Sequence, residues 1–510
     1  MVDHLPDLLA IGVLYVLILI VGIRAGRKER EDGSAEGMLL ARRGMPLFIS
    51  VFTMVATWVG GGYINGTAEE VYNRGIVWTQ APWGYSLSLI LGGLFFAVPL
   101  RRRGCTTMLD PFEHRYGKRM AAVLFLPALV GEIFWSAAIL AALGTTFGTI
   151  LNFDFTTAIL ISAVFAIAYT VVGGLWSVAY TDTVQLIFIL VGLAVTVPFA
   201  VSRGGGLGEI WNQYADRFGS AARLMPPMSA FRGGDGWGNT IWQWIDVAGL
   251  LVFGGIAWQS YFQRVLAMRY HRTAVGMSVL AGFGCMAIAF PAGLVGVVGA
   301  VADWEKAGVE PPAPALVLPY VLKYLTPPVV ATFGLATIAA AVMSSVDSSI
   351  LSASSMFVWN VYRPLIRPAA RDAEIRRAVQ VSVVLVGGLA TLLAVTAESV
   401  YALWFLCSDL VYAILFPQLV MVLFSKRANW IGAAVGAAVG LFLRLGGGEP
   451  FLGIPPFLPY PMRDPELGIQ FPFRTFAMLS GLATIYLVSR LTSRHAPPVH
   501  RHYVLAGGGA

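Results

Sequence analysis

The sequence predicts an all-α polytopic membrane protein with about 13 transmembrane helices. Of its 510 residues, 57% are hydrophobic and only 12% are charged, and the mean hydropathy is +0.71. Apolar segments of about 20 residues, long enough to cross a bilayer as a helix, recur along the whole chain. Two of these segments contain adjacent glycines beside a tryptophan. No ordinary soluble domain has this composition.

The spans follow from hydropathy in chain order, and they form a single transmembrane domain over residues 1–510. The expected spans are Leu8–Ile23, Phe48–Val71, Trp78–Leu100, Leu124–Leu151, Thr156–Val172, Thr181–Val201, Ile241–Leu266, Ala274–Val301, Ala315–Val361, Arg376–Val395, Val400–Phe424, Trp430–Leu445 and Phe473–Leu491.

Basic residues in the loops predict the orientation of the chain. Clusters such as Arg24–Arg30, Arg101–Arg103 and Arg264–Arg272 follow alternate spans. Because Lys and Arg are enriched in cytoplasmic loops, we expect the chain to lie in a plasma membrane with its N-terminus outside the cell and its C-terminus in the cytoplasm. These loops account for the net charge of +7, so no nucleic-acid partner is implied.

Two apolar segments are expected to contain broken helices. Val55–Ala68 reads V-A-T-W-V-G-G-G-Y-I-N-G-T-A, with three consecutive glycines after Trp58. Glycine in a helix interior costs about 1 kcal/mol relative to alanine. A break frees backbone groups, which a membrane tolerates only beside a cavity or ligand site. Phe253–Tyr261, F-G-G-I-A-W-Q-S-Y, repeats the pattern with Trp258.

The breaks fall in the second and seventh spans, in matching positions of two halves with opposite orientation. Such inverted repeats are typical of transporters that work by alternating access. The predicted halves are residues 45–201 and 239–425, with one extra helix at 8–25 and two at 429–492. The alternative is that the glycine pairs serve only close helix packing.

Acidic residues inside spans are candidate functional groups. Asp347 lies in M-S-S-V-D-S-S, among Ser344, Ser345 and Ser348. Hard oxygen donors of this kind suit a hard cation such as sodium. The serines could instead form only hydrogen bonds within and between helices. Asp182, in Y-T-D-T, could join such a site or cap a helix N-terminus.

Other acidic residues have less distinct settings. Glu132 is one helical turn from Trp135 and could face a cavity or pair internally. Asp246 and Asp409 are expected to form structural ion pairs. Glu449, in G-G-G-E-P after the twelfth span, is expected to be solvated.

Four aromatic residues, Trp58, Tyr85, Trp135 and Trp258, lie in four different spans. Any one of them could belong to an interfacial belt. Aromatic faces around a desolvated site suit a quaternary ammonium, whose charge cannot form hydrogen bonds. A sugar would need several hydrogen-bonding side chains, and an amino acid would need a partner for its carboxylate.

Long motifs resemble the sodium:solute symporter family and, within it, the high-affinity choline transporters. The resemblance runs from about Leu8 to Leu491. It is carried by T-W-V-G-G-G-Y-I-N-G-T-A-E from Thr57, G-Y-S-L-S-L-I-L-G-G-L-F-F-A from Gly84, T-M-L-D-P-F from Thr107, Y-T-V-V-G-G-L-W-S-V-A-Y-T-D from Tyr169, W-Q-S-Y-F-Q-R-V-L from Trp258, M-S-S-V-D-S-S-I-L-S-A-S-S-M-F from Met343 and L-F-L-R-L-G-G-G-E-P from Leu441.

The resemblance implies a LeuT-type 5+5 inverted-repeat core and sodium-coupled, chloride-dependent choline uptake. The positions matching the family's choline cage are Trp58, Tyr85, Trp135 and Trp258. Those matching its general sodium site are Ala56, Val59 and Ala341, through backbone carbonyls, and Ser344 and Ser345, through hydroxyls. A further sodium site of some relatives falls on Asp182, Asp347 and Ser348. No motif places the chloride ion.

The sequence leaves several alternatives open. The same fold could carry betaine, carnitine or proline, or the chain could be a choline sensor that does not pump. An enzyme is not expected, because the spans contain no catalytic constellation. A homo-oligomer is left open. Loops rich in Ala and Arg, such as R-P-A-A-R-D, and a tail shorter than in the animal members favour a bacterial source.

Overall fold

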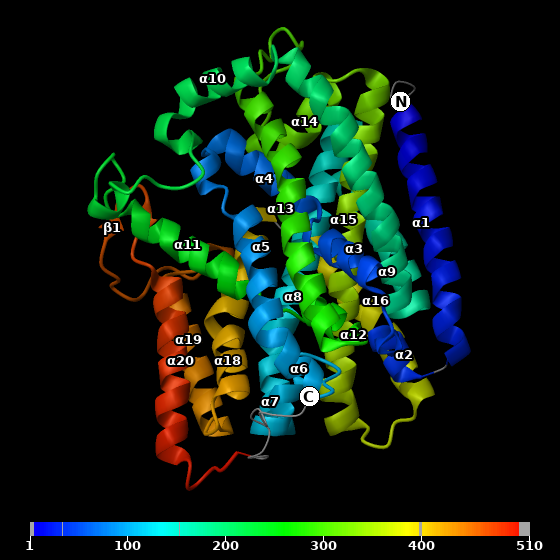
Figure 1. Ribbon diagram of the computed structural model, residues 1–510, viewed down its shortest axis with the longest axis vertical. Coiled ribbons are helices and arrows are strands. Elements are labelled where there is room, and N and C mark those ends of the chain that lie inside the picture. The colour runs from blue at the N-terminus through cyan, green and yellow to red at the C-terminus, as the bar shows by residue number, and fades with distance from the viewer. Residues whose placement is uncertain (1–4, 33, 152–153, 397–399, 499–510) are drawn as a thin grey trace.

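The computed structural model describes residues 5–32, 34–151, 154–396 and 400–498, and its long helices run side by side in a bundle (Figure 1). The elements that form the bundle are α1 (Leu5–Asp32), α3 (Leu47–Trp58), α4 (Gly61–Asn73), α5 (Ala81–Leu91), α6 (Val98–Arg102), α8 (Lys118–Leu151), α9 (Phe155–Arg203), α11 (Thr240–Gly254), α12 (Gln259–Ala267), α13 (His271–Val301), α15 (Pro328–Phe357), α16 (Asp372–Thr396), α17 (Val400–Leu410), α18 (Phe416–Phe424), α19 (Trp430–Gly446) and α20 (Phe473–Thr492).

Shorter elements connect these helices. They are α2 (Ala35–Leu40), α7 (Asp110–Tyr116), α10 (Leu207–Phe218), α14 (Val317–Tyr324) and a small antiparallel pair, β1 (Arg463–Asp464) with β2 (Gly468–Ile469). π-Helical turns join α5 to α6 (Gly92–Ala97), extend α15 (Val358–Ile366) and join α17 to α18 (Val411–Leu415). Single 3₁₀ turns lie at Ala41–Arg43, Ile76–Trp78, Gly219–Ala222, Ala230–Arg232, Pro314–Leu316 and Pro450–Leu452.

The span count agrees with the sequence. Within the described residues, 10 helical segments can cross a membrane by length and composition, and the bent α3–α4 pair makes up to 11. α19 is a shorter apolar helix. α9 has 49 residues, but its backbone leaves the helical region at Gly174 (φ 51°, ψ −153°). As one helix it would be about 70 Å long, against a hydrocarbon core of about 30 Å. Counting α19 and both arms of α9 gives the predicted number.

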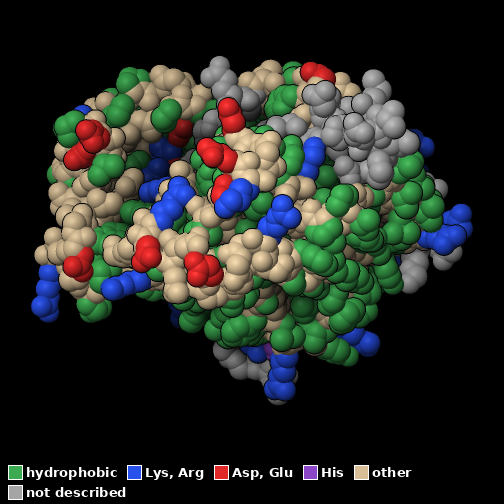
Figure 2. All heavy atoms as spheres, turned by 90° about the horizontal axis from the view of Figure 1, so that it is seen from above, with side chains coloured by type: hydrophobic (Ala, Val, Ile, Leu, Met, Phe, Trp, Pro, Cys, Tyr) green, Lys and Arg blue, Asp and Glu red, His purple; other side chains and the backbone are tan. Residues whose placement is uncertain are grey.

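The ends of the bundle also fit an odd number of crossings. α1 begins at the upper end of the bundle and α20 ends at the lower end (Figure 1). Large apolar side chains point outward from the long helices, including Val13, Phe290 and Leu385, as expected where helices face lipid. Seen from the upper end, acidic and basic side chains gather on that end, whereas the lower flank of the view is almost wholly hydrophobic (Figure 2).

α15 is the central helix. Every residue from Gly334 to Met356 is buried, because α15 packs against α8 and both arms of α9. Its serines and Asp347 therefore face protein rather than lipid. The structure gives the order of the helices, and the grouping into halves at 45–201 and 239–425 stays a prediction.

Candidate functional site

The first break separates α3 from α4, which meet at an angle of 53°. Only Val59 and Gly60 lie between the two helices. A Cβ on Gly60 would lie 2.0 Å from Ser345 Oγ, and one on Gly61 would lie 2.2 Å from Val342 Cγ2. The glycines therefore permit the close approach of α15, as the packing alternative expects. The backbone at the bend has negative φ at Val59 and Gly60, so a role of the glycines in breaking the helix stays a prediction.

The second break separates α11 from α12. Trp258 precedes α12 with extended backbone (φ −114°, ψ 135°), and its indole Nε1 donates to the Gly254 carbonyl at 2.8 Å. A Cβ on Gly255 would lie 2.6 Å from Ser88 Oγ. As at the first break, adjacent glycines let a neighbouring helix, here α5, come close to the backbone.

The four predicted cage residues meet between the two breaks. The ring centroids of Trp58 and Trp135 are 5.7 Å apart, those of Trp135 and Trp258 are 5.3 Å apart, and those of Trp58 and Tyr85 are 6.4 Å apart. All three contacts are edge-to-face, an arrangement that aromatic quadrupoles favour. Side chains from α3, α5, α8 and the start of α12 thus form one aromatic cluster.

A small cavity of about 30 Å³ lies among these rings. Cys407 and Ser408 of α17 also line it, and the sequence reading did not single them out. Tyr85 Oη and Ser408 Oγ are 3.3 Å apart. Trp58 Nε1 is buried without a hydrogen-bond partner among the described residues. Among those residues, no Arg, Lys or His lines the cavity.

A second, larger cavity of about 1000 Å³ adjoins the aromatic one. Both are lined by Gly62, Tyr63 and Ile139, and the larger one continues along α4 and α11 to β1 and β2. We call it the vestibule. Elements that line it, α4, α11 and β1, lie above α19 and α20 in the view of Figure 1.

Oxygen atoms converge where α3 meets α15. Ser344 Oγ donates to the Ala56 carbonyl at 2.8 Å and lies 3.0 Å from the Ala341 carbonyl. One hydroxyl cannot donate fully to both carbonyls. A cation could accept lone pairs from all three oxygens, which are the donor type that sodium prefers. The structure therefore brings together Ala56, Ala341 and Ser344, as the sequence predicts.

The other two predicted members of this group lie nearby. Ser345 Oγ donates to the Thr57 carbonyl at 2.8 Å, a partner that the sequence reading did not include. Val59 is fully buried in the bend between α3 and α4. Its backbone is not helical (φ −88°, ψ 57°), so its carbonyl no longer points along the axis of α3, as the prediction requires.

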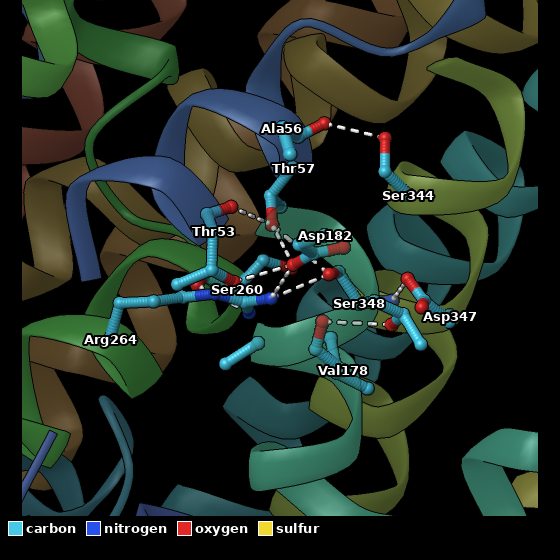
Figure 3. Close-up of polar contacts among 12 residues, drawn as sticks. Thr53, Ala56, Thr57, Val178, Asp182, Ser260, Arg264, Ser344, Asp347 and Ser348 are labelled. Atoms are coloured by element: carbon cyan, nitrogen blue, oxygen red, sulfur yellow. Dashed lines mark hydrogen bonds and ion pairs between the residues drawn. The ribbon is translucent and has the colours of Figure 1, made fainter. Parts of the chain in front are cut away.

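A buried charged cluster lies one turn further along α15 (Figure 3). Asp182 accepts a hydrogen bond from Thr53 and pairs with Arg264, whose Nη2 is 3.4 Å from Asp182 Oδ2. Asp347 accepts from Tyr169 Oη at 2.8 Å. Asp182 and Asp347, with Ser348, are each fully buried. The capping role considered for Asp182 is wrong, because the second arm of α9 begins well before it.

Arg264 does not lie where the sequence predicts. The sequence assigns it to a cytoplasmic basic cluster, yet its side chain is fully buried. Its Nη2 donates to Ser348 Oγ at 2.5 Å. Two of the three residues of the second predicted sodium site, Asp182 and Ser348, are therefore in contact with a guanidinium.

Glu132 connects α8 to the second break and to α15. Its carboxylate accepts from Ser260 N at 3.3 Å, from Ser260 Oγ at 2.8 Å and from Ser349 Oγ at 2.6 Å. Ser260 lies in the first turn of α12, where free amides and the helix dipole favour a negative charge. Of the two expectations for Glu132, internal pairing is the one observed.

A further charged network holds the last two helices to the core. Arg444 of α19 contacts Asp409 at 2.5 Å and Glu449 at 2.6 Å. Arg474 of α20 contacts Asp409 at 2.9 Å and Asp246 at 3.5 Å. Structural pairing of the two aspartates is confirmed. The expectation that Glu449 is solvated is wrong, because the chain turns back at Gly446–Gly448 and buries it.

Comparison with known proteins places this geometry in a family. The sequence profile described as the sodium:solute symporter family matches residues 38–440. The chain is 48% identical to high affinity choline transporter 1 of Homo sapiens, over 96% of this chain and 86% of the relative. It is 46% identical to high-affinity choline transporter 1 of Drosophila melanogaster, over 98% and 81%.

The fold has a counterpart among solved structures. A Na⁺-coupled sialic acid symporter, in a substrate-bound outward-open state, superposes with a TM-score of 0.80. The superposition covers 96% of this chain and 98% of the symporter, at 17% sequence identity. At that identity the likeness concerns the fold alone, and it agrees with the LeuT-type arrangement expected from the sequence.

Proposed function

Because the chain belongs to the sodium:solute symporter family, we propose that it takes up choline across the plasma membrane by sodium-coupled alternating access. It is a multi-pass membrane transporter and not an enzyme. The proposal rests above all on the four aromatic rings that converge between two helix breaks, beside the oxygen cluster at the α3–α15 contact.

The walls of the aromatic cavity fit choline better than its acidic analogues. Trp58, Tyr85, Trp135 and Trp258 offer π faces to a trimethylammonium, at about 0.5–2 kcal/mol per contact. Tyr85 Oη, Ser408 Oγ and the unpartnered Trp58 Nε1 offer hydrogen bonds to the choline hydroxyl. Among the described residues the cavity wall has no cationic side chain to receive the carboxylate of betaine, carnitine or proline.

Sodium binding at the α3–α15 contact supplies the coupling in this proposal. The ion is held by the carbonyls of Ala56, Val59 and Ala341 and by the hydroxyls of Ser344 and Ser345. α3 carries Trp58, so sodium fixes one wall of the cage. It favours the state open to the vestibule only to the extent that it binds that state more tightly. At the second position, formed by Asp182, Asp347 and Ser348, Arg264 contacts Asp182 and Ser348.

The membrane potential adds to the driving force. The vestibule opens to the outside in this proposal, with the N-terminus outside and the C-terminus in the cytoplasm. Choline and sodium both enter as cations, each driven by about 2.3 kcal/mol per 100 mV. Chloride dependence also belongs to the proposal, through the resemblance to the choline transporters, and no residues are assigned to it.

Uptake into proteoliposomes tests the function. We expect radiolabelled choline to accumulate when a sodium gradient is imposed, and to accumulate less when gluconate replaces chloride. Uptake that is equal with and without the gradient would remove the coupling. Binding without accumulation would favour a choline sensor. Competition by betaine, carnitine or proline as strong as that by unlabelled choline would favour another substrate.

Alanine variants test the cage. Trp58→Ala and Trp258→Ala should each weaken choline binding by about tenfold or more, because each removes a cation–π contact and a cage wall. Choline affinity is measured on purified protein whose monodispersity and thermal stability match the unchanged chain. An unaltered affinity in both variants would exclude the cage.

A further inference from the structure

Arg264 lies at the far end of the short helix that begins at the cage. α12 starts directly after Trp258 and ends at Ala267, so a cage wall and a buried guanidinium share one helix. Arg264 reaches from α12 to α3, α9 and α15, and Figure 3 shows it pointing into the polar cluster there. A buried arginine is costly unless its hydrogen bonds and its charge are compensated.

Every hydrogen bond that the guanidinium donates to a described residue ends on an oxygen atom. It donates from Nε to Thr53 Oγ1 at 3.3 Å and from Nη1 to the Ser260 carbonyl at 3.1 Å. It donates from Nη2 to Ser348 Oγ at 2.5 Å and to Asp182 Oδ2 at 3.4 Å. Two hydroxyls, a carbonyl and a carboxylate are also the donor set that a sodium ion would take.

The charges around the two breaks are a second reason to regard Arg264 as a substitute for a bound cation. Three carboxylates, those of Glu132, Asp182 and Asp347, are buried there with the single guanidinium of Arg264. Ser260 connects the groups, since its carbonyl accepts from Arg264 and its hydroxyl donates to Glu132. With all three carboxylates ionised, these four groups carry an excess of two negative charges, which two monovalent cations would neutralise. Uncompensated charge inside a membrane is strongly unfavourable.

We propose that Arg264 is a built-in cation that fills the second cation position at Asp182 and Ser348, so that each choline is coupled to one sodium ion, bound at Ala56, Ala341 and Ser344. This inference rests on the proposed function. One sodium and one choline are then the two cations that neutralise the region.

The flux ratio of the unchanged protein is the first test. Radiolabelled sodium and radiolabelled choline are followed in parallel in the same proteoliposomes, at a clamped membrane potential. We expect about one sodium per choline, because the region then reaches neutrality. A ratio of about two would overturn the inference while leaving sodium-coupled choline uptake intact. Choline uptake with no sodium flux would instead contradict the proposed function.

Removing the internal cation is the second test. Arg264→Gln keeps a hydrogen-bonding side chain but frees Asp182, so purified protein should bind one more sodium than the unchanged chain. Adding Asp182→Asn to Arg264→Gln should abolish that gain. Arg264→Lys is the matched control, since its ammonium keeps the charge and should leave sodium binding near the unchanged level.

The unchanged chain and a single variant complete the test if Arg264→Gln fails to fold. Ser348→Ala alone should leave the amount of bound sodium as it is, because Arg264 and not sodium occupies that position and the substitution changes no charge. Loss of a bound sodium in Ser348→Ala would overturn the inference. Ser344→Ala should remove the sodium that the proposed function requires, so a failure there is separable from a failure at Ser348.

Discussion

Both helix breaks contain adjacent glycines that let another helix come close, but the helix ends that make the polar contacts have opposite polarity. At the first break α3 ends, and the carbonyl of Ala56 in its last turn accepts a hydrogen bond from the Ser344 hydroxyl on α15. At the second break α12 begins, and its free amides meet the Glu132 carboxylate on α8. The C-terminal end of a half-helix favours a cation and the N-terminal end favours an anion.

This difference assigns distinct tasks to the two breaks. The first is suited to bind sodium directly through backbone oxygens. The second is held by a fixed carboxylate, and it positions Trp258 at the cage and Arg264 in the charged cluster. Substitutions at the α3–α15 contact should therefore act mainly on sodium, and substitutions at the contact between Glu132 and Ser260 mainly on choline.

The largest effect is expected from Gly60→Ala, which disrupts the first of the two helix breaks. The added Cβ would lie 2.0 Å from Ser345 Oγ, so α3 and α15 would have to separate. Overpacking costs about 1–3 kcal/mol, and we expect most sodium-driven uptake to be lost. Initial uptake rates are normalised to the inserted protein. Gly66→Ala is the control, since no atom lies within 4 Å of its added Cβ. Equal rates in the two variants would contradict the prediction.

An intermediate effect is expected from Glu132→Gln at the second break. The amide keeps the shape of the carboxylate but removes its charge from the start of α12. Hydrogen bonds to charged groups contribute about 1.5–3 kcal/mol, so choline affinity should fall about tenfold or more. Equilibrium choline binding at saturating sodium measures it. The sodium concentration for half-maximal uptake should change less than in Ser344→Ala. If Glu132→Gln changed the sodium dependence of uptake more than the choline affinity, the second break would have to be assigned to sodium instead of choline.

The smallest effect is expected from Ser345→Ala, which sharpens the description of the first break. Among the described residues, Ser345 Oγ bonds only the Thr57 carbonyl, whereas Ser344 Oγ faces two carbonyls. We expect about a threefold rise in the sodium concentration for half-maximal uptake, as for loss of one hydrogen bond. Ser344→Ala should raise it further. Sodium titrations of the two variants, made at one choline concentration, show whether that order is correct.

Features that depend on local pattern were predictable from the sequence. Hydropathy gave the spans, and adjacent glycines gave both breaks. The four aromatic residues could be grouped because they lie in spans and two of them adjoin the breaks, and the family resemblance matched the same four positions to a choline cage. The α3–α15 oxygen cluster followed from the same resemblance.

Features that depend on distant partners were not predictable. Arg264 lies near basic residues of a loop, and its neighbours in the sequence do not indicate that its partner is Asp182, 82 residues earlier. Glu449 follows three glycines and looks exposed, yet Gly448 adopts a left-handed conformation (φ 89°) that turns it back to Arg444. In both cases an ion pair decides burial, and an ion pair of this kind is a property of the packed helices.

The edge-to-face packing of the cage rings has a consequence for substrate discrimination. Trp135 lies against both Trp58 and Trp258, so a ligand must part rings whose contacts contribute about 0.5–1.5 kcal/mol each. A trimethylammonium regains this through its charge, and the neutral carbon isostere of choline does not. The aromatic walls would then act as a filter for formal charge rather than for size. A competition experiment with that isostere, showing inhibition as strong as by choline, would refute such filtering.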